Sequence, residues 1–198
     1  MRKLFFLFML LLSLQSRAQL EKGARLAGLQ TNLIIGDIYA TNPDLNFSQN
    51  TKRYGLNLVP TLGWAVQRNW IVGGQATLGF WHERRVPPYS PGINYNADNY
   101  YDLGIAPFTR LYLDITRNKK WKGYGLASIE LATVQRVYKT SYQNGTTQST
   151  KDSFVDLRGS LGAGLAYFGP QLSIDLNAAI TGLRLGVYKT IAPGKKIF

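Results

Sequence analysis

The only histidine of the chain, His82, precedes Glu83 directly and lies eight residues before Ser90. An imidazole, a carboxylate and a hydroxyl are the groups of a serine hydrolase, which needs all three within hydrogen-bond reach of one another. In an extended strand, however, adjacent side chains point to opposite faces, so Glu83 would point away from His82. We therefore expect the His82 side chain to lie at a membrane interface, as an aromatic ring would, and we predict no catalytic residue.

The composition restricts other chemistry. The chain of 198 residues has 23 Lys and Arg, 11 Asp and Glu, a formal net charge of +12 and no cysteine. Without cysteine there is no disulfide scaffold, thiolate metal site or cysteine nucleophile. With one histidine there is no histidine-rich metal site, so we expect neither a metal nor a cofactor. The basic residues are scattered without a basic helix or a stacking motif, which argues against nucleic acid as a partner.

Nine charged residues of both signs lie on the small, polar side of segments that alternate in polarity. Opposite charges that share one face can pair, and pairing makes burial of charge tolerable. We expect these residues to fill an interior as a salt-bridge network, with a narrow conducting path as the alternative. They are Asp102, Arg110, Asp114, Glu130, Arg136, Asp156, Arg158, Asp175 and Arg184.

Six further basic residues fall in three polar stretches that we interpret as loops. Ammonium and guanidinium groups bind phosphate oxyanions, so these residues are candidate contacts of lipopolysaccharide, with solvated loop charge as the alternative. They are Lys52, Arg53, Arg84, Arg85, Lys139 and Lys151. Lys119, Lys120 and Lys122, near a short turn, are expected to be solvated.

The elements that position these residues follow a period of two. In Tyr54–Trp64 the even positions are bulky and apolar, and the odd ones are mostly small or polar. Alternation of this kind predicts strands rather than helices. Eight strands result, in one domain: 23–39, 54–64, 70–80, 102–115, 121–138, 155–167, 172–181 and 183–188. Pro60 and Pro107 interrupt two of them, and we interpret them as bulges or local changes of register.

The alternation fits two kinds of barrel. A lipocalin-like soluble barrel has its apolar face inside, whereas a membrane barrel has it outside, against lipid. Two observations favour the membrane barrel. The polar face carries mostly small side chains, as a narrow lumen requires. Aromatic residues also recur ten positions apart, which at about 3.3 Å per residue and a tilt of about 40° spans about 25 Å. The predicted lipid-interface aromatics are Tyr54, Trp64, Trp70, Phe80, Trp121 and Tyr167.

The connections alternate in length as well. Long ones at 40–53, 83–99 and 139–153 alternate with short ones at 67–69, 118–120 and 169–170, and the last turn, near Thr181, is short again. Long outer loops and short periplasmic turns are typical of outer-membrane barrels, and an even number of strands places both ends of the barrel on the periplasmic side.

The first eighteen residues predict a secretory signal peptide. Arg2 and Lys3 precede an apolar run of about eleven residues, and Ser16-Arg17-Ala18 offers small residues at the cleavage site. The alternative is an uncleaved amphipathic anchor. We predict residues 1–18 as the signal peptide and 19–198 as the barrel domain, in the outer membrane.

These features resemble small outer-membrane β-barrels of the OmpA/OmpX type, the "porin family / outer membrane protein beta-barrel domain" of Gram-negative bacteria. The resemblance rests on Ala18-Gln19, on the strand pattern 103–113 and on the glycine-rich segment 157–167. Such proteins often end in an aromatic residue that the outer-membrane assembly machinery reads, and Phe198 resembles it. Here, however, Ala192-Pro-Gly-Lys-Lys196 replaces the alternating apolar residues expected before it.

The sequence therefore predicts an all-β protein, an eight-stranded antiparallel up-and-down transmembrane β-barrel, most simply a monomer. We expect a non-enzymatic role in envelope structure or surface contact through its outer loops. Its expected partners are outer-membrane lipids and lipopolysaccharide and the assembly machinery. Two alternatives stay open: an enzyme that modifies lipid A, and a soluble secreted barrel that carries a small apolar ligand.

Overall fold

The computed structural model describes residues 20–42, 47–85, 92–169, 172–179 and 182–193. The predicted signal peptide, Ser90 and Phe198 lie outside these residues. The described part contains eight β-strands: β1 (Arg25–Asn42), β2 (Phe47–Gln67), β3 (Trp70–Arg85), β4 (Ile93–Asp114), β5 (Trp121–Tyr142), β6 (Thr147–Phe168), β7 (Leu172–Ala179) and β8 (Gly182–Ile191).

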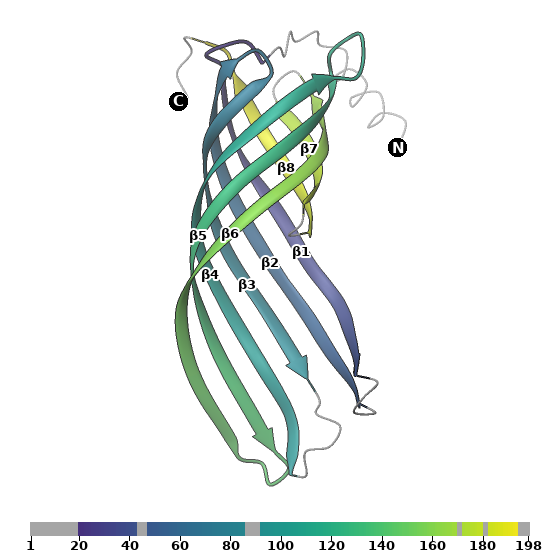
Figure 1. Cartoon of the computed structure of the whole chain (residues 1–198), viewed down its shortest axis with the longest axis vertical. Helices are drawn as coiled ribbons and strands as arrows, with labels where there is room; N and C mark the ends of the chain where they lie inside the picture. Colours follow the sequence, from purple (N-terminus) through teal and green to yellow (C-terminus); the bar gives the residue numbers. More distant parts are fainter. Residues whose placement is uncertain (1–19, 43–46, 86–91, 170–171, 180–181, 194–198) are drawn as a thin grey trace, which may run out of the picture.

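The strands form one closed barrel (Figure 1). Each strand pairs antiparallel with the next in sequence, and β1 pairs with β8 to close the ring. This order confirms the predicted eight-stranded up-and-down barrel. β1 begins and β8 ends at the upper end of Figure 1, where the β2–β3 and β4–β5 turns also lie; we call this the turn end. The opposite end, where β3 and β5 finish, is the loop end.

The pairing register sets the tilt of the strands. Passing from Val155 through successive paired residues around the ring returns to β6 at Leu165, ten residues along the strand. The intermediate residues are Thr133, Leu103, Leu78, Leu58, Thr31, Leu185 and Leu176. A displacement of ten residues is about 33 Å, and eight strand spacings are about 38 Å, so the strands tilt by about 40° from the axis. Ten residues of strand then cover about 25 Å of barrel height.

The polarity of the wall is the reverse of that of a water-soluble barrel. Outward-facing apolar side chains are widely exposed, among them Leu157 at 71% and Ile105 at 66%. Inward-facing residues include Arg110 and Asn177, each at 0% exposure. In each strand, the alternate residues with apolar side chains therefore lie outside, and those with small or polar side chains line the lumen.

Six strands extend further toward the loop end than the sequence predicted. Parts of the stretches assigned to loops, at 40–42, 47–53, 83–85, 93–99, 139–142 and 147–153, continue β1 to β6. These parts are polar on both faces, so they lack the alternation that identified the rest of each strand. The loop assignments at these positions were wrong for that reason.

The last two strands are much shorter than the others. β8 pairs with β1 only between Arg25 and Thr31 of β1, and β7 pairs with β6 only between Gly162 and Phe168 of β6. The barrel is therefore closed only over its part nearest the turn end. Beyond the β7–β8 hairpin, β1 and β6 diverge. The six long strands β1 to β6 form a trough there, which opens toward the viewer in Figure 1.

The prolines do not shift the register, contrary to our prediction. Pairing of β2 with β3 pauses at Pro60, and pairing of β4 with β5 pauses at Pro107, but both resume in the same register. Each proline lacks an N–H donor toward one neighbour only and is exposed on the outer face. The register shifts lie elsewhere, between Ala65 and Gln67 in β2 and between Ile93 and Tyr95 in β4.

Candidate functional site

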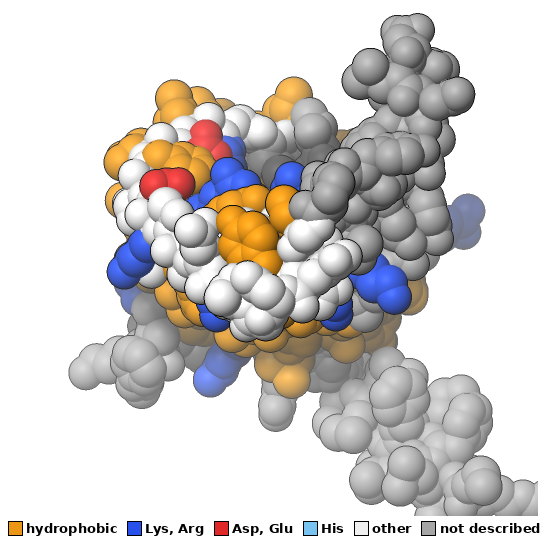
Figure 2. All heavy atoms as spheres, turned by 90° about the horizontal axis from the view of Figure 1, so that it is seen from below, with side chains coloured by type: hydrophobic (Ala, Val, Ile, Leu, Met, Phe, Trp, Pro, Cys, Tyr) orange, Lys and Arg blue, Asp and Glu red, His pale blue; other side chains and the backbone are white. Residues whose placement is uncertain are grey.

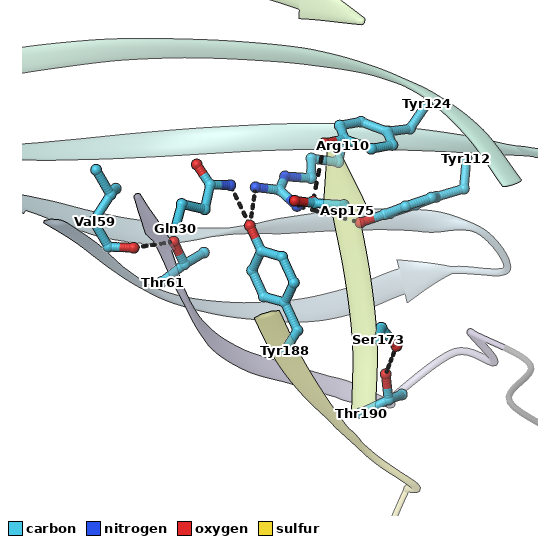
Figure 3. Close-up of polar contacts among 10 residues, drawn as sticks. All are labelled: Gln30, Val59, Thr61, Arg110, Tyr112, Tyr124, Ser173, Asp175, Tyr188 and Thr190. Atoms are coloured by element: carbon cyan, nitrogen blue, oxygen red, sulfur yellow. Dashed lines mark hydrogen bonds and ion pairs between the residues drawn. The ribbon is translucent and has the colours of Figure 1, made fainter. Parts of the chain in front are cut away.

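The centre of the lumen is a buried arginine in a cage of phenols. Arg110 of β4 donates from Nη1 to Asp175 Oδ2 at 2.8 Å and from Nη2 to the Tyr188 hydroxyl at 2.7 Å. The Tyr124 hydroxyl also donates to Asp175 Oδ2, at 2.9 Å. Figure 3 shows the group, with Gln30 donating to the Tyr188 hydroxyl. Because Arg110 and Asp175 are 0% and 2% exposed, this ion pair blocks the turn-end half of the lumen.

A second ion-pair group lies nearer the loop end. Arg158 of β6 donates from Nε to Asp156 at 2.7 Å and from Nη1 to Asp102 of β4. The Asp102 side chain is 1% exposed, but Arg158 and Asp156 are 26% and 41% exposed. This group lies where β7 no longer covers β6, which explains its partial exposure.

A third group of alternating charges crosses four strands inside the trough. Glu83 forms an ion pair with Arg53 at 3.0 Å and accepts a hydrogen bond from Arg85 at 2.9 Å. Asp98 in turn forms an ion pair with Arg85 at 3.3 Å and accepts a hydrogen bond from Arg136 at 2.7 Å. The two carboxylates are more buried than the three guanidiniums above them. Seen from the loop end, Figure 2 shows basic and acidic side chains around this mouth.

A fourth group closes the turn end. Lys122 Nζ contacts Asp114 Oδ1 and donates to Asn69 Oδ1 at 2.9 Å, and Arg68 approaches Asp114 to 3.8 Å. The Lys122 side chain is 1% exposed, so our expectation that it is solvated was wrong. Lys122 faces inward on β5, where its Nζ lies 5.8 Å from the centroid of the Phe168 ring and the Asp114 carboxylate compensates its charge.

The nine predicted lumen charges thus lie on the inner face but do not form one cluster. The structure brings together Arg110 with Asp175, Asp102 with Asp156 and Arg158, and places Arg136 and Asp114 in the groups at the two ends. Glu130 lies against Gly104 of β4, where a side chain would collide with its carboxylate. Arg184 of β8 is 8% exposed. Sequence reasoning missed Lys122, Tyr124 and Tyr188, although their inward-facing positions in predicted strands could have identified them. It also missed Asp98, which lies in a part of β4 that the sequence analysis assigned to a loop.

The predicted interface aromatics lie on the outer face. Tyr54, Trp64, Trp70, Phe80 and Trp121 are 39–53% exposed, and Tyr167 is half-buried beside Trp121, with ring centroids 5.1 Å apart. Tyr101, which the sequence analysis did not select, joins Phe80 at 5.4 Å. Trp64, Trp70, Trp121 and Tyr167 lie toward the turn end, and Tyr54, Phe80 and Tyr101 toward the loop end. Two aromatic rows therefore bound the apolar band.

His82 lies on the outer face beside the loop-end aromatic row. Its ring is 4.8 Å from Tyr54, and its Nδ1 lies 2.7 Å from Asn99 Oδ1. Glu83 points to the inner face, where it pairs with Arg53 and Arg85. The described contacts therefore join His82 to an amide and a phenol, not to a carboxylate.

The six candidate phosphate contacts divide between the two faces of the wall, and all lie in strands rather than loops. Lys52, Arg84, Lys139 and Lys151 are exposed on the outer face. Arg53 and Arg85 point inward and pair with carboxylates. Because alternate residues of a strand face opposite sides, neighbours in the sequence have different surroundings.

No helix in the described part of the chain is long and apolar enough to cross a membrane. Among the same residues, no group of three or more His, Cys, Asp or Glu side chains is placed to hold a metal ion.

Comparison with known proteins gives similarity to solved structures. No protein-family model matches the chain, and no curated protein matches it. Among solved structures, the chain is similar to Ail, the attachment invasion locus protein of Yersinia pestis, at 20% identity and a TM-score of 0.33, covering 85% of this chain and 95% of Ail. Ail in complex with the heparin analogue sucrose octasulfate gives 18% identity and a TM-score of 0.31, covering 84% and 92%.

Proposed function

We propose that the chain is an integral outer-membrane β-barrel without enzymatic activity, with a role in envelope structure or surface contact through its loop end. The observation that carries this proposal is the reversed polarity of the wall. A closed barrel satisfies all backbone hydrogen bonds within the hydrocarbon region, and its lipid-facing side must be apolar. The two aromatic rows lie about 25 Å apart along the axis, the height of such a band.

The lumen supports a structural role rather than transport. Eight strands enclose a space that side chains can fill, and Arg110, Asp175 and the surrounding tyrosines fill it here. Because Arg110 and Asp175 pair with each other across the lumen, ions would have to break a buried contact to pass. We expect little or no conductance.

The loop end is the part that would face the outside of the cell. Outer-membrane barrels carry their longer connections outside and their short turns in the periplasm. Here the six long strands carry polar side chains well beyond the aromatic row, so contacts with other surfaces would form on the trough. A monomeric state and recognition by the assembly machinery through Phe198 stay predictions.

The alternatives find less support. A lipocalin-like carrier needs an apolar interior, whereas this interior holds Arg110, Asp175 and Asn177. A hydrolase acting on lipid A needs an acid behind its histidine, and Glu83 points away from His82.

Expression of the full chain in a Gram-negative host tests the proposal. We expect the protein in the outer-membrane fraction, and we expect it to migrate faster on a detergent gel before boiling than after it. In planar bilayers the folded protein should give no large, stable single-channel currents. Recovery as a water-soluble protein without detergent would refute the membrane assignment, and large currents would refute the filled lumen.

A further inference from the structure

We infer that the outer face of the barrel carries a binding site for the phosphate groups of outer-leaflet glycolipid, formed by Lys52, Arg84, Lys139 and Lys151. We call these four residues the cationic strip. The inference rests on the proposed function, because it requires the apolar band to lie in a membrane. Of the six basic residues that the sequence offers as phosphate contacts, it selects the four that share the outer face.

The strip is continuous across neighbouring strands. Lys52 of β2 and Arg84 of β3 are directly opposite in the register. Arg84 and Lys139 of β5 both pair with the small Ala97 of β4, one from each side. Lys151 of β6 pairs with Val137, so it lies diagonally next to Lys139. Three cations thus share one row of the sheet, and the fourth adjoins it.

The height of the strip matches a membrane surface. Lys52 lies two residues beyond the interface residue Tyr54, and Arg84 lies four residues beyond Phe80. These two and four residues correspond to about 5 and 10 Å along the axis at a tilt of about 40°. Lys151 lies six residues beyond Leu157, which is near the loop-end edge of the band, so it is about 15 Å further out. The headgroup layer outside the hydrocarbon core is about 5–8 Å thick, so Lys52 and Arg84 lie near the level of lipid phosphates. The long side chains of Lys139 and Lys151 start further out and would extend back toward this level.

The charge balance also points to an anion. Like charges directly opposite each other destabilise a sheet. No carboxylate of a described residue lies within 4.0 Å of a strip nitrogen, whereas the inward neighbours Arg53 and Arg85 are both paired. On β1 the register partner of Lys52 is Asp37, whose side chain is outside the described part. Arg84, Lys139 and Lys151 are therefore the cations that most need an external counter-charge.

Arg84 is also held in place. Its guanidinium lies over the ring of Tyr95, with the Cζ atom 4.2 Å from the ring centroid. Stacking of this kind fixes the plane of the guanidinium while leaving its N–H groups free for a bidentate oxyanion. A phosphate that bridges Arg84 and Lys139 would then contact the strip over Ala97.

Retention of defined lipids by the purified full chain tests the inference. The protein is reconstituted in phosphatidylcholine nanodiscs that contain either bis-phosphorylated lipid A or the same lipid after removal of its phosphates. Bound lipid is counted by native mass spectrometry over a range of lipid concentrations. The test variant is Arg84→Gln/Lys139→Gln. The matched control is Lys22→Gln/Arg117→Gln, which removes the same charge from two exposed positions at the turn end.

We expect the wild type and the control variant to retain phosphorylated lipid A with apparent affinities within twofold of each other. The test variant should bind roughly 30-fold more weakly, from about fivefold for each cation near a charged surface. An excess of inorganic phosphate should not displace the lipid. The gel shift on boiling verifies that each variant is folded.

Equal retention of the two lipids, or equal affinities of the test and control variants, would overturn the inference and leave the proposed function intact. Displacement by inorganic phosphate would also overturn it, in favour of a site for free phosphate. Failure of the wild type to insert into nanodiscs would instead remove the proposed function.

Discussion

Replacement of Arg110 by alanine should destabilise the barrel more than any change at the loop end. The guanidinium is 0% exposed and holds Asp175 at 2.8 Å and the Tyr188 hydroxyl at 2.7 Å. Without it, Asp175 would be a buried carboxylate with no cation beside it and with phenol hydroxyls, those of Tyr124 and Tyr188, as its donors. Removal of one partner of a buried ion pair costs about 3–5 kcal/mol. Such a loss is a large fraction of the stability of a typical domain, which is about 5–15 kcal/mol.

The comparison needs graded controls from the same protein. Arg158→Ala removes a side chain that is 26% exposed, so water can hydrate the carboxylates that it leaves, and we expect a loss of about 1–2 kcal/mol. Lys151→Ala removes an exposed loop-end charge and should change stability by less than about 0.5 kcal/mol. Arg110→Leu/Asp175→Leu removes both charges, and it should recover part of the loss because no unpaired charge remains.

Reversible urea unfolding of the protein in lipid vesicles, followed by tryptophan fluorescence and by the gel shift on boiling, measures these differences. The expected order of destabilisation is Arg110→Ala, then Arg158→Ala, then Lys151→Ala. If Arg110→Ala and Lys151→Ala unfold at the same urea concentration, the buried pair does not stabilise the barrel and the reasoning is refuted.

Three other changes test separate parts of the structure, each by the same unfolding measurement. Gly28→Ala places a methyl group against the Tyr188 ring and the Val187 carbonyl and should cost about 1–3 kcal/mol, whereas Gly74→Ala, which has no atom within 4 Å of the added carbon, should be close to neutral. Leu161→Arg, near the middle of the apolar band, should cost about 2–4 kcal/mol in a bilayer and Leu157→Arg, near its edge, at most about 1 kcal/mol; equal losses would contradict the membrane position of the band. Asp114→Asn leaves the buried Lys122 ammonium without a counter-charge and should cost about 1–3 kcal/mol, and no loss would show that Lys122 is hydrated in solution.

The sequence alone predicts the strands best where they are apolar on one face. The sequence predicts Tyr54–Trp64 and the segment 155–167 as strands because apolar side chains that face lipid alternate there with small or polar ones that face the lumen. The same strands continue beyond the aromatic row, at 47–53 and 147–153, without this alternation, because both faces there are polar. Their strand structure depends on pairing with distant segments, which periodicity along one segment does not reveal.

The sequence predicts that charged residues fill the lumen, but not which of them pair. Parity places Arg110, Asp175 and Arg158 on one face, but the grouping of charges depends on register and barrel tilt. A tilt of about 40° brings Asp102 of β4 to Arg158 of β6, two strands away. Lys122 appears solvated in the sequence because it lies near a turn next to other lysines. The side chain is buried nevertheless, because this position of β5 faces the lumen.

Because β7 is much shorter than β6, the backbone of β6 is hydrogen-bonded differently in its two halves. Between Gly162 and Phe168, the backbone of β6 is paired on both sides, with β5 and with β7. Between Thr147 and Leu161, among the described residues, it pairs on the β5 side only. Since the N–H groups of an antiparallel strand point alternately to its two neighbours, every second amide of this outer stretch has no partner strand. Amide hydrogen exchange along β6 should therefore be uniformly slow at the turn end and alternate between slow and fast, residue by residue, toward the loop end.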